Sequence, residues 1–184
     1  DGPRMPLQAT QILTPGRGFI WKAEAKAAGP VFMSVTDHYA AGEGRMRVAL
    51  LGLFPMVNAS NPDIARSAAG RLLGESCWLP AAFLPEYGAV WHEVDSLHAE
   101  VTLTVDDLTA PLTLTIDEEG RLKEVVLPRW KDDIKAFVPF GVAIGEEQAF
   151  GGYTIPSRVR GGWWYGGERY SEFVRFTIEQ AVFY

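Results

Sequence analysis

A chain of 184 residues can bury a sizeable core without disulfides, and no repeat or linker divides this one, so we expect a single domain over residues 1–184. The formal net charge is −6, with 17 Lys and Arg against 23 Asp and Glu and no basic stripe, which argues against nucleic-acid binding. The single cysteine, Cys77, excludes an internal disulfide and a multi-cysteine zinc site.

The first 18 residues contain three prolines and three glycines, two of them typical of turns, and they predict an irregular or edge segment. They lack the basic and apolar regions of a signal peptide. No apolar run in the chain approaches the roughly 18 residues of a membrane span, so we expect a soluble protein. Because the chain begins with Asp1 and not with Met, we also expect that a preceding segment was removed.

Three stretches with a period of two come next and predict β-strands. They cover residues 19–27, 31–39 and 45–54. Gly29-Pro30 and the turn at residues 40–44 separate them, so the pattern indicates an antiparallel meander. Asp37 and Tyr39 share a face that is apolar where it begins, which makes Asp37 a candidate for an inward-pointing carboxylate.

A helix is predicted over residues 62–78. Asn61 is a suitable N-cap, Pro62 suits the first helical position, and Asp63 places a favourable charge in the first turn. Spacings of three and four put five side chains on one face. These are Ile64, Ala68, Arg71, Glu75 and Trp78. Pro80 ends or kinks this helix.

After Gly88 the strand pattern resumes. Strands are predicted at residues 89–94, 98–105, 110–116 and 121–127. The polar turn 117–120 joins the last two as a hairpin. Residues 128–150 are the least periodic part and predict a loop or flap with a short strand, and residues 153–184 predict two or three more strands.

One helix inside a β-rich chain gives the fold class α+β, mainly β. We predict a strongly curved antiparallel sheet, a half-barrel of roughly eight to ten strands, wrapped around the helix as a plug. A cavity between the sheet and the helix is the usual place for an apolar ligand in such an architecture.

Four segments of the chain resemble a bacterial family of unknown function, from Phe19 onward. They are GRMRVALLGLF, RLLGESCWLP, LTLTIDEEGRL and YTIPSRVRGGW. More remotely, the chain resembles the LolA/LolB-like lipoprotein carriers, in which a half-barrel closes over a helical plug and holds acyl chains. This resemblance implies a fold and an apolar ligand, but no activity and no catalytic residue. Separately, we expect a soluble protein of the bacterial cytoplasm or periplasm. The chain differs from the carriers in lacking a lipoprotein-type cysteine near its start.

Arg71 and Glu75 are the strongest candidates for chemistry because they lie one helical turn apart on an otherwise apolar face. They predict either an ion pair that ties the helix to the sheet, or a polar anchor or acid–base pair for a ligand. Asp37 beside Tyr39 predicts either proton transfer or hydrogen bonds to the adjacent turn. Cys77 is expected to be a buried apolar residue, and the three histidines show no metal-binding spacing.

The leading hypothesis is binding or carriage of a hydrophobic small molecule or lipid, with no metal and no cofactor. The predicted ligand-binding residues are Trp21, Tyr39, Arg71, Trp78, Trp91 and Trp163. The alternative is an enzyme acting on an apolar substrate in the same cavity, with Glu75 or Asp37 as acid or base and Arg71 stabilising negative charge. A third possibility is an interaction module that uses the aromatic turn at residues 163–165.

Overall fold

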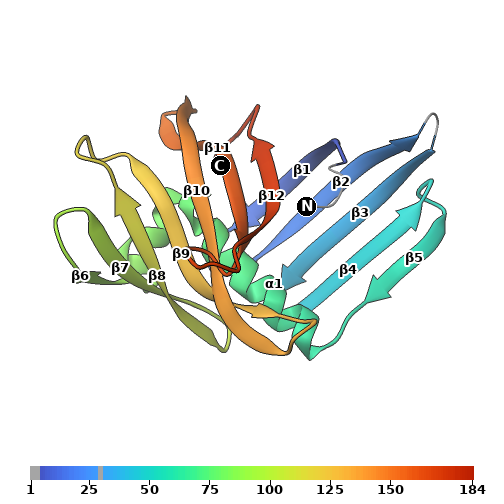
Figure 1. The fold of residues 1–184 in the computed structure, drawn as a ribbon, viewed down its shortest axis with the longest axis horizontal. Coiled ribbons are helices and arrows are strands. Elements are labelled where there is room, and N and C mark those ends of the chain that lie inside the picture. The colour runs from blue at the N-terminus through green and yellow to red at the C-terminus, as the bar shows by residue number, and fades with distance from the viewer. Residues whose placement is uncertain (1–4, 29–30) are drawn as a thin grey trace.

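The computed structural model describes residues 5–28 and 31–184, and within these ranges it contains twelve β-strands, one α-helix and three short 3₁₀ helices (Figure 1). The strands are β1 (Leu7–Thr14), β2 (Gly18–Ala28), β3 (Val31–Ala40), β4 (Glu43–Leu50), β5 (Phe54–Ala59), β6 (Val90–Glu93), β7 (His98–Val105), β8 (Leu108–Ile116), β9 (Leu122–Lys131), β10 (Ala136–Phe150), β11 (Tyr153–Trp163) and β12 (Ser171–Thr177). The helical segments are α1 (Pro62–Gly74), η1 (Glu75–Trp78), η2 (Pro80–Phe83) and η3 (Pro85–Tyr87).

The strands form two antiparallel sheets, each with its strands in chain order. The first sheet runs β1-β2-β3-β4-β5 and the second runs β12-β11-β10-β9-β8-β7-β6. The prediction of a single curved sheet is therefore wrong in the number of sheets, because the helical stretch between β5 and β6 interrupts the pairing of consecutive strands. The coarser prediction, a mainly β chain with one helix, is confirmed.

Helix α1 starts where the sequence places it. The Asn61 side chain accepts hydrogen bonds from the backbone N–H groups of Asp63 and Ile64, at 3.0 and 2.9 Å, and Pro62 occupies the first turn. The α-helix ends at Gly74, and the predicted last turn, residues 75–78, is the tighter 3₁₀ helix η1.

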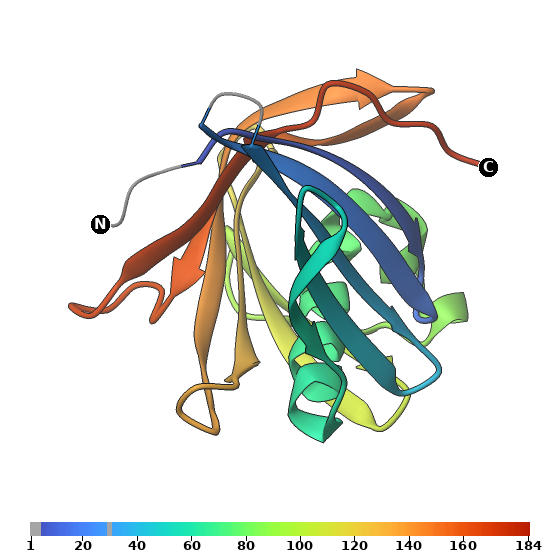
Figure 2. The ribbon, with the colours of Figure 1, turned by 90° about the vertical axis from the view of Figure 1, so that its right-hand side faces the viewer.

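Helix α1 lies between the two sheets and packs on both. In Figure 2 the five-stranded sheet crosses in front of α1, and the yellow-green strands of the seven-stranded sheet pass behind it. Ala68, Leu72 and Leu73 are each less than 5% exposed. Two glycines allow the close approach, because a Cβ at Gly44 would lie 2.7 Å from Ala65 Cα, and one at Gly74 would lie 3.2 Å from a methyl carbon of Leu127.

A direct link between the sheets lies at the turns. The buried Tyr39 hydroxyl of β3 donates to Asp106 Oδ2, at 2.6 Å, in the turn between β7 and β8. The Gly42 backbone N–H donates to the same carboxylate oxygen at 3.0 Å. Both bonds hold the β3–β4 turn of one sheet against the β7–β8 turn of the other.

One predicted strand ends earlier than the sequence indicates. The strand predicted at residues 45–54 ends at Leu50, because Leu51 and Gly52 have positive φ angles of 54° and 69° and turn the chain into β5. The first segment contains β1, which is indeed an edge strand. The predicted turn at Gly29-Pro30 lies outside the described residues.

The largest error concerns residues 128–150, predicted as a loop or flap. The strand β9 continues to Lys131, and β10 is a 15-residue strand that pairs with both β9 and β11. Alternate positions of β10 from Val138 to Ile144 are buried, but the opposite positions hold Pro139, Gly141, Ala143 and Gly145 and no polar side chain, so the sequence shows no period of two there.

The close contact at Gly44 gives a test of the helix position. Gly44→Ala should destabilise the protein by about 2 kcal/mol, because the added methyl group meets the backbone of α1 and forces the helix to shift. Gly145→Ala is the control, since its Cβ would make an ordinary 3.5 Å contact, and we expect a change within about 1 kcal/mol. Urea denaturation measures both, and equal effects would mean that α1 does not pack on β4 as described.

Candidate functional site

The structure brings together three residues that the sequence singled out, namely Arg71, Glu75 and Asp37. Arg71 Nε donates to Glu75 Oε1 at 2.6 Å, one helical turn away, and a terminal nitrogen of Arg71 donates to Asp37 Oδ2 on β3 at 2.7 Å. The three side chains are 15–20% exposed. One guanidinium therefore pairs with two carboxylates at the contact between α1 and the five-stranded sheet.

A fourth residue, Gln11, closes the network and was missed by the sequence analysis. Its amide oxygen accepts from the other terminal nitrogen of Arg71 at 3.0 Å, and its amide nitrogen donates to Glu75 Oε2 at 2.6 Å. Gln11 lies on β1, opposite Trp21 of β2. The alternation in residues 7–14 could have revealed it as an amide on the face shared by Leu13.

Aromatic rings pack on the Arg71 guanidinium. Its central carbon lies 4.6 Å from the ring centre of Phe19 and 5.2 Å from that of Trp21. Burial lowers the pKa of Arg71, but the charges of Glu75 and Asp37 outweigh burial and raise the pKa above its ordinary value. The guanidinium stays charged, and its geometry is that of an ion pair that fixes the helix to β1, β2 and β3.

Tyr39 does not join this network. Its hydroxyl donates to Asp106, and burial together with that carboxylate raises the pKa of Tyr39. Cys77 is also buried, which raises the pKa of its thiol. Among the residues described by the structure, no three His, Cys, Asp or Glu side chains gather as a metal ion would require.

The predicted tryptophans lie in different surroundings. Trp78 is buried and its Nε1 donates to the Pro156 carbonyl oxygen at 2.9 Å. Trp91, on the edge strand β6, is 44% exposed, and its Nε1 donates to the Phe83 carbonyl oxygen. Trp21 lies on the inner face of the five-stranded sheet beside Arg71. Trp163 is half-buried on β11.

Trp163 belongs to a second cluster of aromatic rings around a cation, made of Phe140, Trp163 and Arg129, which the sequence analysis also missed. Its ring packs against Phe140 with a centroid distance of 4.9 Å. The Arg129 guanidinium of β9 lies over both rings, 4.8 Å from the centre of Phe140 and 5.1 Å from that of Trp163. Arg129 also contacts α1, because Nε donates to the Ser67 carbonyl oxygen at 3.3 Å. No local pattern singles out Arg129, since it lies in the stretch predicted as a loop.

The aromatic turn beside Trp163 packs partly on its own sheet. The Tyr165 hydroxyl donates to Glu124 Oε1 at 2.8 Å, and its ring covers Gly141, where a Cβ would lie 2.1 Å from the ring. Burial and Glu124 raise the pKa of Tyr165. This turn therefore has a structural role at β9 and β10.

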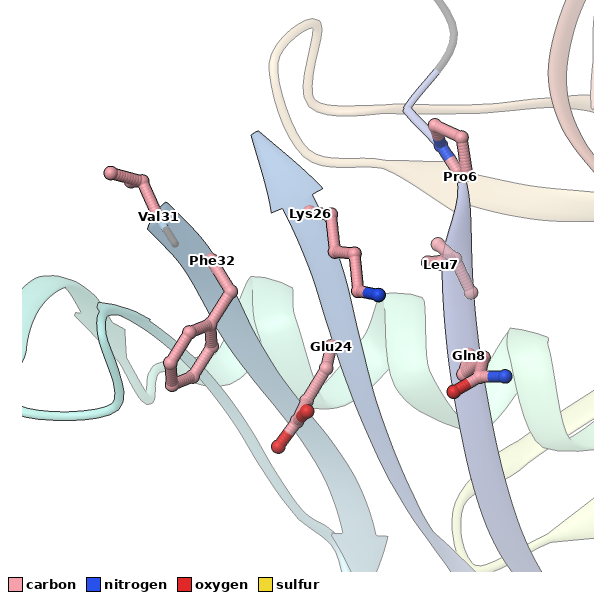
Figure 3. A pocket seen from close by; sticks show the side chains of 7 residues that line it. All are labelled: Pro6, Leu7, Gln8, Glu24, Lys26, Val31 and Phe32. Carbon is pink, nitrogen blue, oxygen red and sulfur yellow. The ribbon is translucent and has the colours of Figure 1, made fainter. Parts of the chain in front are cut away.

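Two surface hollows lie on the five-stranded sheet. The larger, of about 400 Å³, is lined by Pro6, Leu7, Gln8, Glu24, Lys26, Val31 and Phe32. Figure 3 shows most of these side chains on the side of the sheet away from α1. The smaller, of about 230 Å³, is lined by Thr36, His38, Arg45 and Arg47. Neither includes a predicted ligand-binding residue.

Comparison with protein-family models matches residues 1–183 to a family of unknown function, DUF6920. The chain belongs to this family. No curated protein and no solved structure matches it. These comparisons show no link to LolA/LolB-like carriers. In the part of the chain that the structure describes, no helix is both long and apolar enough to cross a membrane.

Removing one carboxylate tests the role of the Arg71 network. Glu75→Gln should destabilise the protein by about 2 kcal/mol, because Arg71 then keeps only one charged partner in a poorly solvated place. Glu24→Gln, on the exposed face of β2, is the control and should change stability by less than about 0.5 kcal/mol. A Glu75→Gln protein that melts at or above the parent temperature would instead make Glu75 the leading catalytic candidate.

Proposed function

We propose that this DUF6920 protein binds or carries a hydrophobic small molecule or lipid on the inner face of its five-stranded sheet, beside α1. One observation carries the proposal. The face that meets α1 at Gly44 continues along the strands as an apolar surface that the helix does not cover. Strand register assigns Met33, Val35, Met46, Val48 and Val57 to it.

Exposure on this face is lowest at the helix contact, and Met46, the next residue of β4 on the face after Gly44, is already 37% exposed. Gly44 and Tyr39 are buried, Val35 and Val48 are half-buried, and Val57 is 40% exposed. An apolar sheet face that leads away from a buried charged network is suited to an acyl chain or another flat or flexible apolar molecule. The remote resemblance to the LolA/LolB-like carriers supports the same ligand class and the idea that sheet and helix together enclose it.

The aromatic residues at both margins of α1 also favour an apolar ligand. Trp21 lies on the inner face of the first sheet, and Trp163 lies half-buried on the second. Both rings contact a guanidinium, so each offers one apolar surface next to a positive charge. For the alternative of an enzyme, Asp37 or Glu75 would have to act on the substrate while bound to Arg71.

A neutral fluorescent probe, N-phenyl-1-naphthylamine, tests the proposal. We expect saturable binding at micromolar concentration with quenching of tryptophan emission. Val57→Glu should weaken binding at least about tenfold, because it places a charge on the inner face. Asn58→Glu, the next residue but on the outer face of β5, should leave binding within about twofold.

Two results would contradict the proposal. Absence of saturable binding to the native protein would mean that the apolar face does not accept small ligands. Equal weakening by Val57→Glu and Asn58→Glu, with both variants folded by circular dichroism, would place the probe elsewhere.

A further inference from the structure

The two arginines beside α1 are both partly buried but differ in their partners. Arg71 pairs with two carboxylates and an amide. Arg129 forms no salt bridge with any described residue, and its one hydrogen bond there is the 3.3 Å bond from Nε to the Ser67 carbonyl oxygen. Its two terminal nitrogens donate to none of the described residues, so the outer edge of the guanidinium is unused.

The surroundings of Arg129 disfavour its positive charge. Burial first, and then the nearby charge of Arg71, lower the pKa of Arg129 to about 10, so it is still protonated at neutral pH. Glu75 and Asp37 act on it with the opposite sign, but both are bound to Arg71. The rings of Phe140 and Trp163 stabilise the cation only in part, because a cation–π contact does not satisfy the N–H groups.

A neighbouring cation shows the contrast. Lys131 lies two residues along β9 and its ammonium is 5.5 Å from the centre of the Trp163 ring. It is paired with Asp133. The lack of a carboxylate partner is therefore specific to Arg129 and is not shared by the other cation that lies at the Trp163 ring.

We propose that Arg129 binds the anionic head group of the apolar ligand, a carboxylate or phosphate, so that the ligand is an anionic amphiphile. This rests on the proposed function. A planar guanidinium with two free N–H groups on one edge matches a carboxylate or phosphate in a bidentate geometry. Helix α1 connects the two parts of the site, because Arg129 contacts it at Ser67, and Arg71 of the same helix binds Asp37 on the sheet face that carries Val35.

The test compares hexadecanoic acid with its neutral methyl ester, by displacement of N-phenyl-1-naphthylamine. The acid should bind the native protein at least about tenfold more tightly than the ester, as expected for hydrogen bonds to a charged group. Arg129→Met should remove this preference and leave ester binding within about threefold. Lys131→Met is the matched control and should keep the preference.

Two further probes identify the source of the anion. Hexadecyl phosphate should show the same dependence on Arg129 as the acid. Acetate and inorganic phosphate at equal concentration should not displace the neutral probe. If these small anions compete as well as the acid does, the site takes a free anion, and the amphiphile assignment is wrong.

The results separate this inference from the function on which it rests. If the ester binds but the acid binds no better, or if Arg129→Met weakens both equally while remaining folded, the head-group role is wrong and the apolar site stands. If no apolar probe binds at all, the proposed function fails, and the inference fails with it. Should Arg129→Met not fold, Arg129→Lys keeps the charge without the bidentate edge and should reduce the acid preference at least about threefold. An unchanged preference in that variant would contradict the inference.

Discussion

The Arg71 guanidinium is the interaction on which the arrangement of helix and sheet depends. It is held by Glu75 on its own helix, by Asp37 on β3 and by Gln11 on β1, so a single charge connects three separate segments. A poorly solvated cation must have such partners, and they can reach it only if α1 lies in one position and rotation. This requirement fixes the helix against the five-stranded sheet, while small residues such as Gly44 allow the backbones to approach.

On its opposite side, α1 is held mainly by apolar packing. There Leu72 and Leu73 belong to one apolar core with residues of the seven-stranded sheet, and Arg129, which contacts the helix from that sheet, has no carboxylate partner among the described residues. The chain has a net charge of −6 and 23 Asp and Glu residues, so the missing partner of Arg129 does not reflect a shortage of acidic residues. The proposed ligand provides the missing anion, and the same ligand would cover the apolar face of β3, β4 and β5.

The sequence predicted what depends on local chemistry. The Asn61 cap and the strand at residues 98–105 were placed correctly because capping and alternation depend on residues that are close in the sequence. Strand β10 was missed because its less buried face, from Pro139 to Gly145, carries no polar side chain to alternate with the buried residues. Arg71, Glu75 and Asp37 were identified as candidates, but the partner Gln11 and the unpaired Arg129 depend on which strands lie beside the helix. Those contacts join residues up to 64 positions apart, and no local pattern encodes them.

The position of a bound amphiphile can be seen directly in a crystal structure of the protein with 16-bromohexadecanoic acid, in which anomalous scattering locates the bromine and electron density locates the carboxylate. We expect the carboxylate at the Arg129 guanidinium and the bromine on the inner face of the five-stranded sheet, near Val48 and Val57. A ligand bound on the outer face, in the hollow lined by Glu24 and Lys26, would contradict this expectation, as would crystals that remain without ligand at saturating concentration.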